Sequence, residues 1–142
     1  MAITTGVNNQ FKSEVMLAEH NLQTNTLKVI LVSSSQNVSA GGPNTYASVT
    51  SQLANGNGYT TGGETLATVS VSTIDSSGIV DFADVSFSNS TISASGAMIY
   101  NSSAGNRAIA VVSFGGTVAS TAGTFTVAMP TADASNAIIR LA

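Results

Sequence analysis

From Thr26 onward, apolar residues recur at every second position or in short runs, and Gly, Asn, Ser and Pro separate these runs. Period-2 segments bounded by turn residues are typical of β-strands that bury one face. The most strongly patterned segment is RAIAVVSF, Arg107 to Phe114, in which apolar side chains occupy both faces. A strand of this kind is covered on both sides, so we expect it near the centre of a sheet. Its alternation predicts Ile109 and Val111 on one face, and Ala108 and Ala110 on the other.

The surrounding segments predict further strands. SSAGN separates 96–101 from 107–114 and has the length of a hairpin turn. Within 79–87 the apolar residues change parity, which one extra residue at Ala83 or Asp84, a β-bulge, would reconcile. Pro130 ends the alternating segment TFTVAM, because proline cannot donate to a β-ladder. The expected strands are 26–32, 65–73, 79–87, 96–101, 107–114, 124–129 and 137–141, with one or two short extended pieces near 46–53 inside a long polar loop, 33–63.

One segment has helical period. Phe11, Val15, Ala18 and Leu22 fall at i, i+4, i+7 and i+11, which predicts a helix over about 7–21, capped by Thr4 or Thr5. A chain of 142 residues has the size of one domain. We therefore expect a single domain, 1–142, that is mainly β: a two-layer antiparallel β-sandwich, jelly-roll-like or Ig-like, with about seven to eight strands and one N-terminal α-helix.

The composition argues against several classes of protein. Charged residues make up 8% of the chain and the net charge is −3, whereas about a quarter of residues are charged in a typical domain. The four Lys and Arg residues are scattered, which predicts no nucleic-acid-binding surface. No apolar run approaches the ~20 residues of a spanning helix, so we expect no membrane partner. The first residues lack the basic and apolar regions of a signal peptide, and no cysteine is present for disulfide or thiol chemistry.

No set of residues predicts a catalytic or metal site. The single histidine, His20, has no second His or Cys with which to hold zinc, and we expect it near the helix C-terminus, where the dipole favours a positive charge. A Ser–His–Asp triad lacks the G-x-S-x-G elbow that would support it. The spacing of Asp81 and Asp84 matches no calcium loop. The sequence therefore predicts a protein that is not an enzyme and has no cofactor.

Two ligand-binding interpretations also fit the sequence poorly. Gly56 and Gly58 match the first two glycines of G-x-G-x-x-G, but Thr61 stands at the third position and no helical pattern follows. We expect a turn-rich loop there. The chain has no Trp and eight aromatic residues in all, which is a weak supply of stacking platforms for a carbohydrate.

The remaining candidates for a functional role are Arg107 and Tyr100, at the two sides of the SSAGN turn. Arg107 has two interpretations. It is either a charge at the rim of the sandwich, paired with Asp81 or Asp84, or an anchor in a protein interface, where arginine is enriched. Tyr100 is the second candidate interface residue.

Several strings in the chain resemble a family of small virion structural proteins of tailed phages. They are MAITTG, FKSEVMLAEHN, GNGYTTGGETL, DFADVSFSNSTISASGAMIYNSS, NRAIAVVSFGG and TAGTFTVAMPTADASNAIIRLA. The resemblance covers nearly the whole chain and is weakest over about 33–50. None of these strings is a catalytic motif.

The resemblance implies a capsid cement or decoration protein at the capsid surface of the virion. Its partners would be the major capsid protein and copies of itself, with a trimer as the assembly that matches local three-fold positions. The residues before the helix and the loop after Ser33 would be free to grip the capsid. A tail, fibre or baseplate accessory protein is the alternative, followed by a glycan-binding module.

Overall fold

Over residues 2–141, which the computed structural model describes, the chain forms ten β-strands, one α-helix and one short 3-10 helix. The helix α1 spans Asn9–Met16 and the 3-10 helix spans Tyr46–Ser48. The strands are β1 (Gly6–Val7), β2 (Leu27–Val32), β3 (Glu64–Thr65), β4 (Ser70–Ile74), β5 (Ser77–Asp81), β6 (Val85–Ser90), β7 (Ser93–Asn101), β8 (Arg107–Ala119), β9 (Gly123–Val127) and β10 (Ile139–Leu141).

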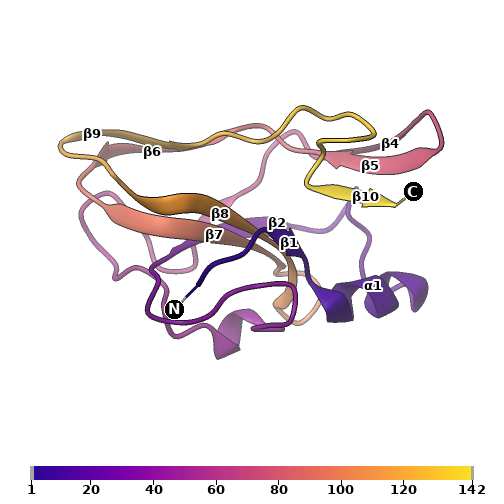
Figure 1. The fold of residues 1–142 in the computed structure, drawn as a ribbon, viewed down its shortest axis with the longest axis horizontal. Helices are drawn as coiled ribbons and strands as arrows, with labels where there is room; N and C mark the ends of the chain where they lie inside the picture. Colours follow the sequence, from indigo (N-terminus) through magenta and orange to yellow (C-terminus); the bar gives the residue numbers. More distant parts are fainter. Residues whose placement is uncertain (1, 142) are drawn as a thin grey trace.

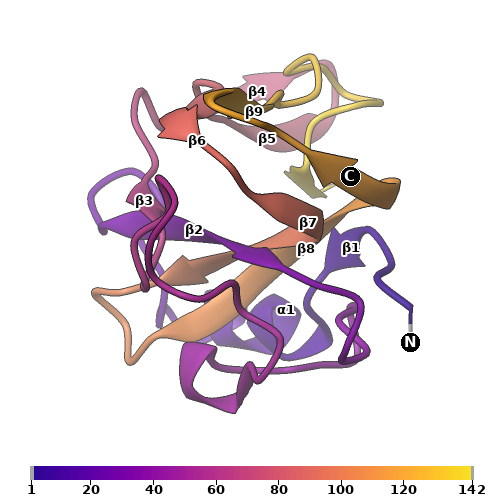
Figure 2. The same cartoon turned by 90° about the vertical axis from the view of Figure 1, so that its left-hand side faces the viewer.

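The strands form two layers, which confirms the predicted antiparallel β-sandwich with one helix (Figures 1 and 2). One layer is a five-stranded sheet in the order β1-β8-β7-β2-β3. The other contains a three-stranded sheet, β10-β5-β4, and a two-stranded sheet, β6-β9. The main core lies between the layers, with Leu31, Ile99 and Ile109 from the large sheet packed with Phe87 and Phe125 from the other layer.

The central position predicted for RAIAVVSF is confirmed. Strand β8 lies between β7 and β1, and both of its faces are buried from Ala108 to Val111. The predicted alternation is wrong, because the register with β7 shifts between Ile99 and Tyr100 and leaves Ile109 as an extra residue. Ile109 and Ala110 therefore both join the core between the layers, while Ala108 and Val111 join a second core on the opposite face.

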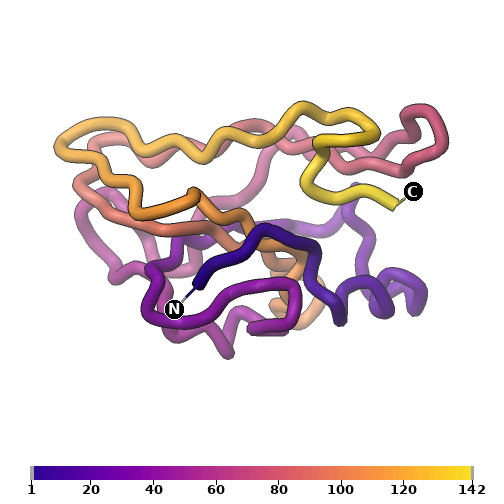
Figure 3. The backbone as a smooth tube through the Cα atoms, in the orientation of Figure 1, coloured from indigo at the N-terminus to yellow at the C-terminus, as the bar shows by residue number. Residues whose placement is uncertain are grey.

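Residues 2–5 and the first half of the loop 33–63 cover that second core, so they are packed on the sheet rather than free, and their contact with a capsid stays a prediction. Val38 is buried, and its backbone carbonyl accepts a hydrogen bond from the backbone N–H of Thr4 at 2.9 Å. Ile3, Tyr46 and Val49 pack against Met98 and the other buried residues of this face. Figure 3 shows the first half of this loop, in purple, running along the lower side of the molecule beside the N-terminal residues.

Helix α1 is shorter than the predicted 7–21. Asn8, rather than Thr4 or Thr5, caps it, since its Oδ1 atom accepts from the backbone N–H groups of Gln10 and Phe11. The preceding residues, Gly6 and Val7, pair with β8 as strand β1. The helix ends at Met16, and Ala18 adopts a left-handed φ of 60°.

Two predicted strands are divided in the structure. Instead of a bulge at Ala83 or Asp84, the chain leaves one sheet after β5 and enters another at β6, so the parity change marks a change of sheet. The predicted strand 65–73 is split into β3 and β4, which lie in different layers, and Thr68 between them has a φ of 53°.

Candidate docking groove

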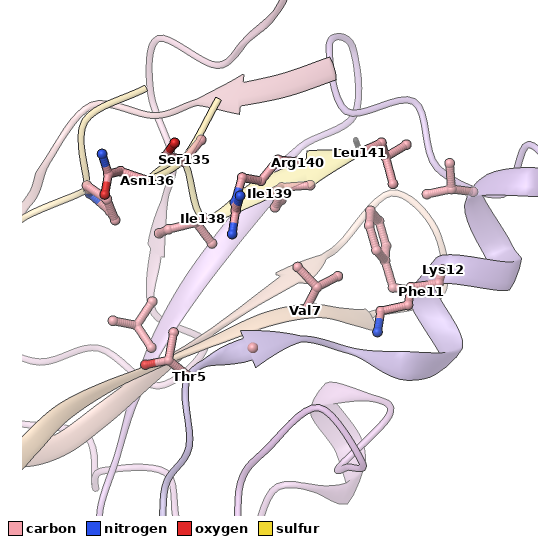
Figure 4. A pocket seen from close by; sticks show the side chains of 15 residues that line it. Thr5, Val7, Phe11, Lys12, Ser135, Asn136, Ile138, Ile139, Arg140 and Leu141 are labelled. Carbon is pink, nitrogen blue, oxygen red and sulfur yellow. The ribbon is translucent and has the colours of Figure 1, made fainter. Parts of the chain in front are cut away.

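An apolar groove opens at one side of the sandwich, where the edge strands of the two layers face each other. Strand β1 is the edge of the five-stranded sheet, and β10 is an edge of the three-stranded sheet. Residues of both strands, together with α1, line a space of about 620 Å³. Figure 4 shows Val7 and the Phe11 ring on one side of this space and Ile139 of β10 on the other.

Helix α1 positions the inner wall of the groove. Phe11 is 2% exposed and Val15 packs against the same core, so one face of the helix is fixed against the sandwich. The N-terminus of the helix is fixed as well, because Nδ2 of Asn8 donates to Oδ1 of Asn44 at 3.0 Å. The wall of the groove is therefore a preformed surface rather than a loose helix.

The groove continues past Phe11 and Val15 toward β4 and β5, where Leu22, Val71 and Ile79 line it. Two large apolar side chains that line it, Val71 and Leu141, are exposed to solvent. Six such side chains are exposed in the described chain: Met16, Leu17, Val71, Ile74, Val118 and Leu141. All of them except Val118 come from the end of α1, from β4 or from β10. A concentration of exposed apolar side chains around a groove is typical of a surface that binds another protein.

Two of the four cationic side chains of the protein lie at the groove, Lys12 on α1 and Arg140 on β10. Figure 4 shows the guanidinium of Arg140 pointing from β10 into the space between the layers. Among residues 2–141 their hydrogen-bond partners are neutral oxygens, Oδ1 of Asn9 at 3.3 Å and the Ala134 carbonyl at 3.1 Å. Asp133 is the nearby acid. Its pKa lies below the ordinary value because Asn136 and the backbone of Ser135 donate to it, with a smaller contribution from Arg140.

A buried polar cluster holds the end of α1 to the large sheet. The Nε2 atom of His20 lies 2.8 Å from Oε2 of Glu14, and Nδ2 of Asn101 lies 3.0 Å from the other ring nitrogen. Asn101 is fully buried and also donates to Oδ1 of Asn25 at 2.8 Å. Because both ring nitrogens of His20 are engaged inside the protein, neither is open to a substrate. His20 lies four residues beyond α1 and so does not occupy the predicted place at its C-terminus.

Arg107 extends this cluster to the surface. Its Nη1 atom donates to Oε2 of Glu19 at 2.9 Å, and its Nε atom lies 3.5 Å from Oε1 of Glu14. The predicted pairing with Asp81 or Asp84 is wrong, since the partners of Arg107 come from α1 and the residues after it. Its position at the start of β8 and its partly exposed side chain agree with a rim charge.

Tyr100, the second candidate interface residue, is buried. Its ring stacks on Tyr46 with 4.8 Å between centroids, and its hydroxyl donates to the Gly62 carbonyl at 2.7 Å. Burial raises the pKa of this hydroxyl above its ordinary value, with a smaller contribution from Tyr46. Its role in the structure is to hold the loop 33–63 against the large sheet, away from any exposed surface.

Sequence reasoning missed the groove residues. The adjacent apolar residues Met16 and Leu17 indicated an exposed apolar patch near the end of the helix, although neither lines the groove. No sequence pattern predicted that α1 and β10 line the same groove, because these elements lie at opposite ends of the chain and only the topology brings them together.

Within the described part of the chain, no group of three or more His, Cys, Asp or Glu side chains is placed to bind a metal ion. The helix α1 is too short to cross a membrane, and the same holds for any other helical segment of residues 2–141. The chain matches no protein-family model, and neither the search of curated proteins nor the search of solved structures returned a match.

Proposed function

We propose that this protein is a non-enzymatic structural component of a phage virion: a capsid cement or decoration protein that binds the major capsid protein at the head surface and stabilises contacts between capsomers. The observation that carries the proposal is the preformed apolar groove with exposed apolar side chains on its rim. A groove of this kind serves a protein that works by binding other proteins.

The rest of the molecule supports such a role. The loop 33–63 and residues 2–5 are packed on the large sheet, so the domain presents fixed surfaces. Pre-formed surfaces bind with a smaller loss of conformational entropy. The surface carries few charges, and uncharged Ser, Thr and Ala side chains are less costly to desolvate than ionised ones.

A cement protein also gains from self-association. In a symmetric oligomer, binding of one subunit to the shell places the others at high effective concentration beside their own sites. A trimer would match the local three-fold positions of a capsid. Homo-oligomerisation is therefore part of the proposal.

The test is to locate the protein on the virion. Heads prepared without the protein would be mixed with the purified chain, and bound copies would be counted by quantitative mass spectrometry and by electron cryomicroscopy. We expect many equivalent copies on the head surface and a higher temperature of head disruption. A few copies confined to the tail would overturn the proposal in favour of a tail, fibre or baseplate accessory protein. Binding to host glycans without binding to heads would instead indicate a glycan-binding module.

A further inference from the structure

The β4–β5 hairpin forms one end of the molecule in Figure 1, at the same end as α1. Every residue of β4 is exposed, and its sequence, SVSTI, contains no charge. Strand β4 is the outer strand of its sheet. An uncharged, exposed edge strand readily associates with other protein chains unless something protects it.

Within residues 2–141, side-chain hydrogen bonds protect only one part of this edge. The side chain of Gln23 accepts from the backbone N–H of Val71 at 3.0 Å and donates to the carbonyl of Val69 at 3.1 Å. The side-chain amide thus replaces a neighbouring strand at the start of β4. The other end of the strand, with Ile74 at the turn, has no such cover among the described hydrogen bonds.

The tip of this hairpin and the groove have complementary chemistry. The tip presents an exposed apolar side chain, Ile74, next to a carboxylate, Asp75, which has no ion-pair partner within residues 2–141. The groove presents an apolar lining next to the cations Lys12 and Arg140, whose hydrogen-bond partners are neutral. Each surface therefore combines apolar groups with a charge opposite to that of the other surface.

We infer that the groove binds the β4–β5 hairpin tip of a second copy of this chain, with Ile74 in the apolar part and Asp75 against Lys12 and Arg140. The occupant is a second copy because both complementary surfaces are present on one chain. Self-association would also cover Val71 and Leu141, which line the groove and are exposed in the single chain.

The contact joins two different surface patches, the tip of one copy and the groove of the next. Such a heterologous contact closes into a ring when its rotation divides a full turn, and three copies would give the trimer of the proposed function. The inference gives the self-association part of the proposed function a specific contact. It rests on that part of the proposed function and not on binding to a capsid. Binding to phage heads is a separate property, measured in a separate experiment.

The experiment compares charge variants by sedimentation-velocity ultracentrifugation and native mass spectrometry of the purified full chain. The groove variant is Lys12→Glu with Arg140→Glu. The tip variant is Asp75→Asn with Ser76→Lys. Asparagine is chosen at position 75 because the φ there is 53°, a conformation that asparagine tolerates. Glu64→Lys, at an exposed site on β3, is the matched control for a change from acid to base.

We expect the natural chain to form oligomers, and each charge variant to weaken association about tenfold or more, because like charges would then face each other. Combining the groove and tip variants restores opposite charges and should recover association. Glu64→Lys should leave association unchanged. Circular dichroism establishes that each variant is folded.

A second pair of changes tests the apolar part without altering charge. Val71→Ser and Leu141→Ser replace groove-lining side chains that are 48% and 59% exposed, so folding should be preserved while association weakens. A monomeric natural chain would overturn the inference, as would oligomers that none of these variants weakens, or charge variants that the combination fails to rescue. An oligomer that fails to bind heads would overturn the proposed function and leave this inference intact.

Discussion

The side-chain amide of Asn101 donates to Nδ1 of His20 at 3.0 Å inside the protein. The orientation of this amide follows from its other end, because Oδ1 accepts from the backbone N–H of Ser103 at 3.0 Å. Nδ1 of His20 is therefore an acceptor without a proton, and Nε2 carries the proton that it donates to Glu14. Long-range ¹H–¹⁵N correlation spectra should show the neutral Nε2–H tautomer.

Asn101→Ala should lower the free energy of unfolding strongly. The change leaves Nδ1 of the buried His20 without its partner, at a cost of about 1–3 kcal/mol, while the N–H of the exposed Ser103 can turn to water. Urea unfolding measures the loss. Asn55→Ala is the control, because Asn55 is exposed and accepts only from the backbone N–H of Thr61. Equal losses in the two variants would contradict the buried cluster described above.

Tyr59 should make the protein sensitive to alkali. Burial raises the pKa of its hydroxyl well above the ordinary value, although a hydrogen bond from the Leu31 N–H opposes the shift. Because the pKa of Tyr59 is higher in the folded state than in the unfolded state, its neutral hydroxyl contributes to the free energy of unfolding. This contribution is complete below the unfolded-state pKa of about 10 and is lost as pH rises above it.

Tyr59→Phe tests this effect. At neutral pH the variant should be less stable by about 1 kcal/mol, because the hydrogen bond from the hydroxyl to Oε1 of Gln52 is lost. Above pH ~10 its free energy of unfolding should fall less steeply than that of the natural chain. Urea unfolding at several pH values gives both results, and parallel pH profiles for the two proteins would contradict the prediction.

The periodicity of the sequence identified the longer strand-forming segments, because alternation reports which side of a strand is buried. It missed β1, and it placed short extended pieces near 46–53, where Tyr46–Ser48 forms a 3-10 helix. It could not locate the extra residue at Ile109, since the pattern of RAIAVVSF is apolar on both faces and fits either phase. It also could not separate β5 from β6. A change of parity has the same appearance whether it arises from a bulge or from a change of sheet.

The limits of α1 and the position of the groove depend on tertiary contacts. Val7 falls inside the predicted helix 7–21, but pairing with Ala110 draws it into the sheet, with Gly6 opposite Val111. The cluster of Glu14 and His20 requires Asn101, which is distant in sequence, so no local pattern predicted it. For the same reason the partners of Arg107 could not be chosen correctly among the acidic residues.

Arg107→Ala should cost about 1 kcal/mol of stability. The ion pair with Glu19 is exposed and contributes little, but Glu14 is buried and loses one of its two partners. Arg107→Lys should recover part of the loss, because lysine keeps the charge but lacks the fork that reaches both carboxylates. Urea unfolding at low and high salt measures these differences. A variant of unchanged stability with weakened oligomer or head binding would instead identify Arg107 as an interface anchor.

Gly63 is a position where any side chain should disrupt the fold. Its φ is 79°, and a methyl group there would overlap the backbone carbonyl of Val29 on strand β2. Gly63→Ala should therefore cost several times the roughly 1–2 kcal/mol that a left-handed alanine costs in open space. Gly105→Ala is the matched control, because Gly105 has a φ of 65° and no atom lies within 4 Å of the added carbon. Thermal unfolding of the two variants should separate them clearly, and similar midpoints would show that the loop does not pack against β2 at Gly63.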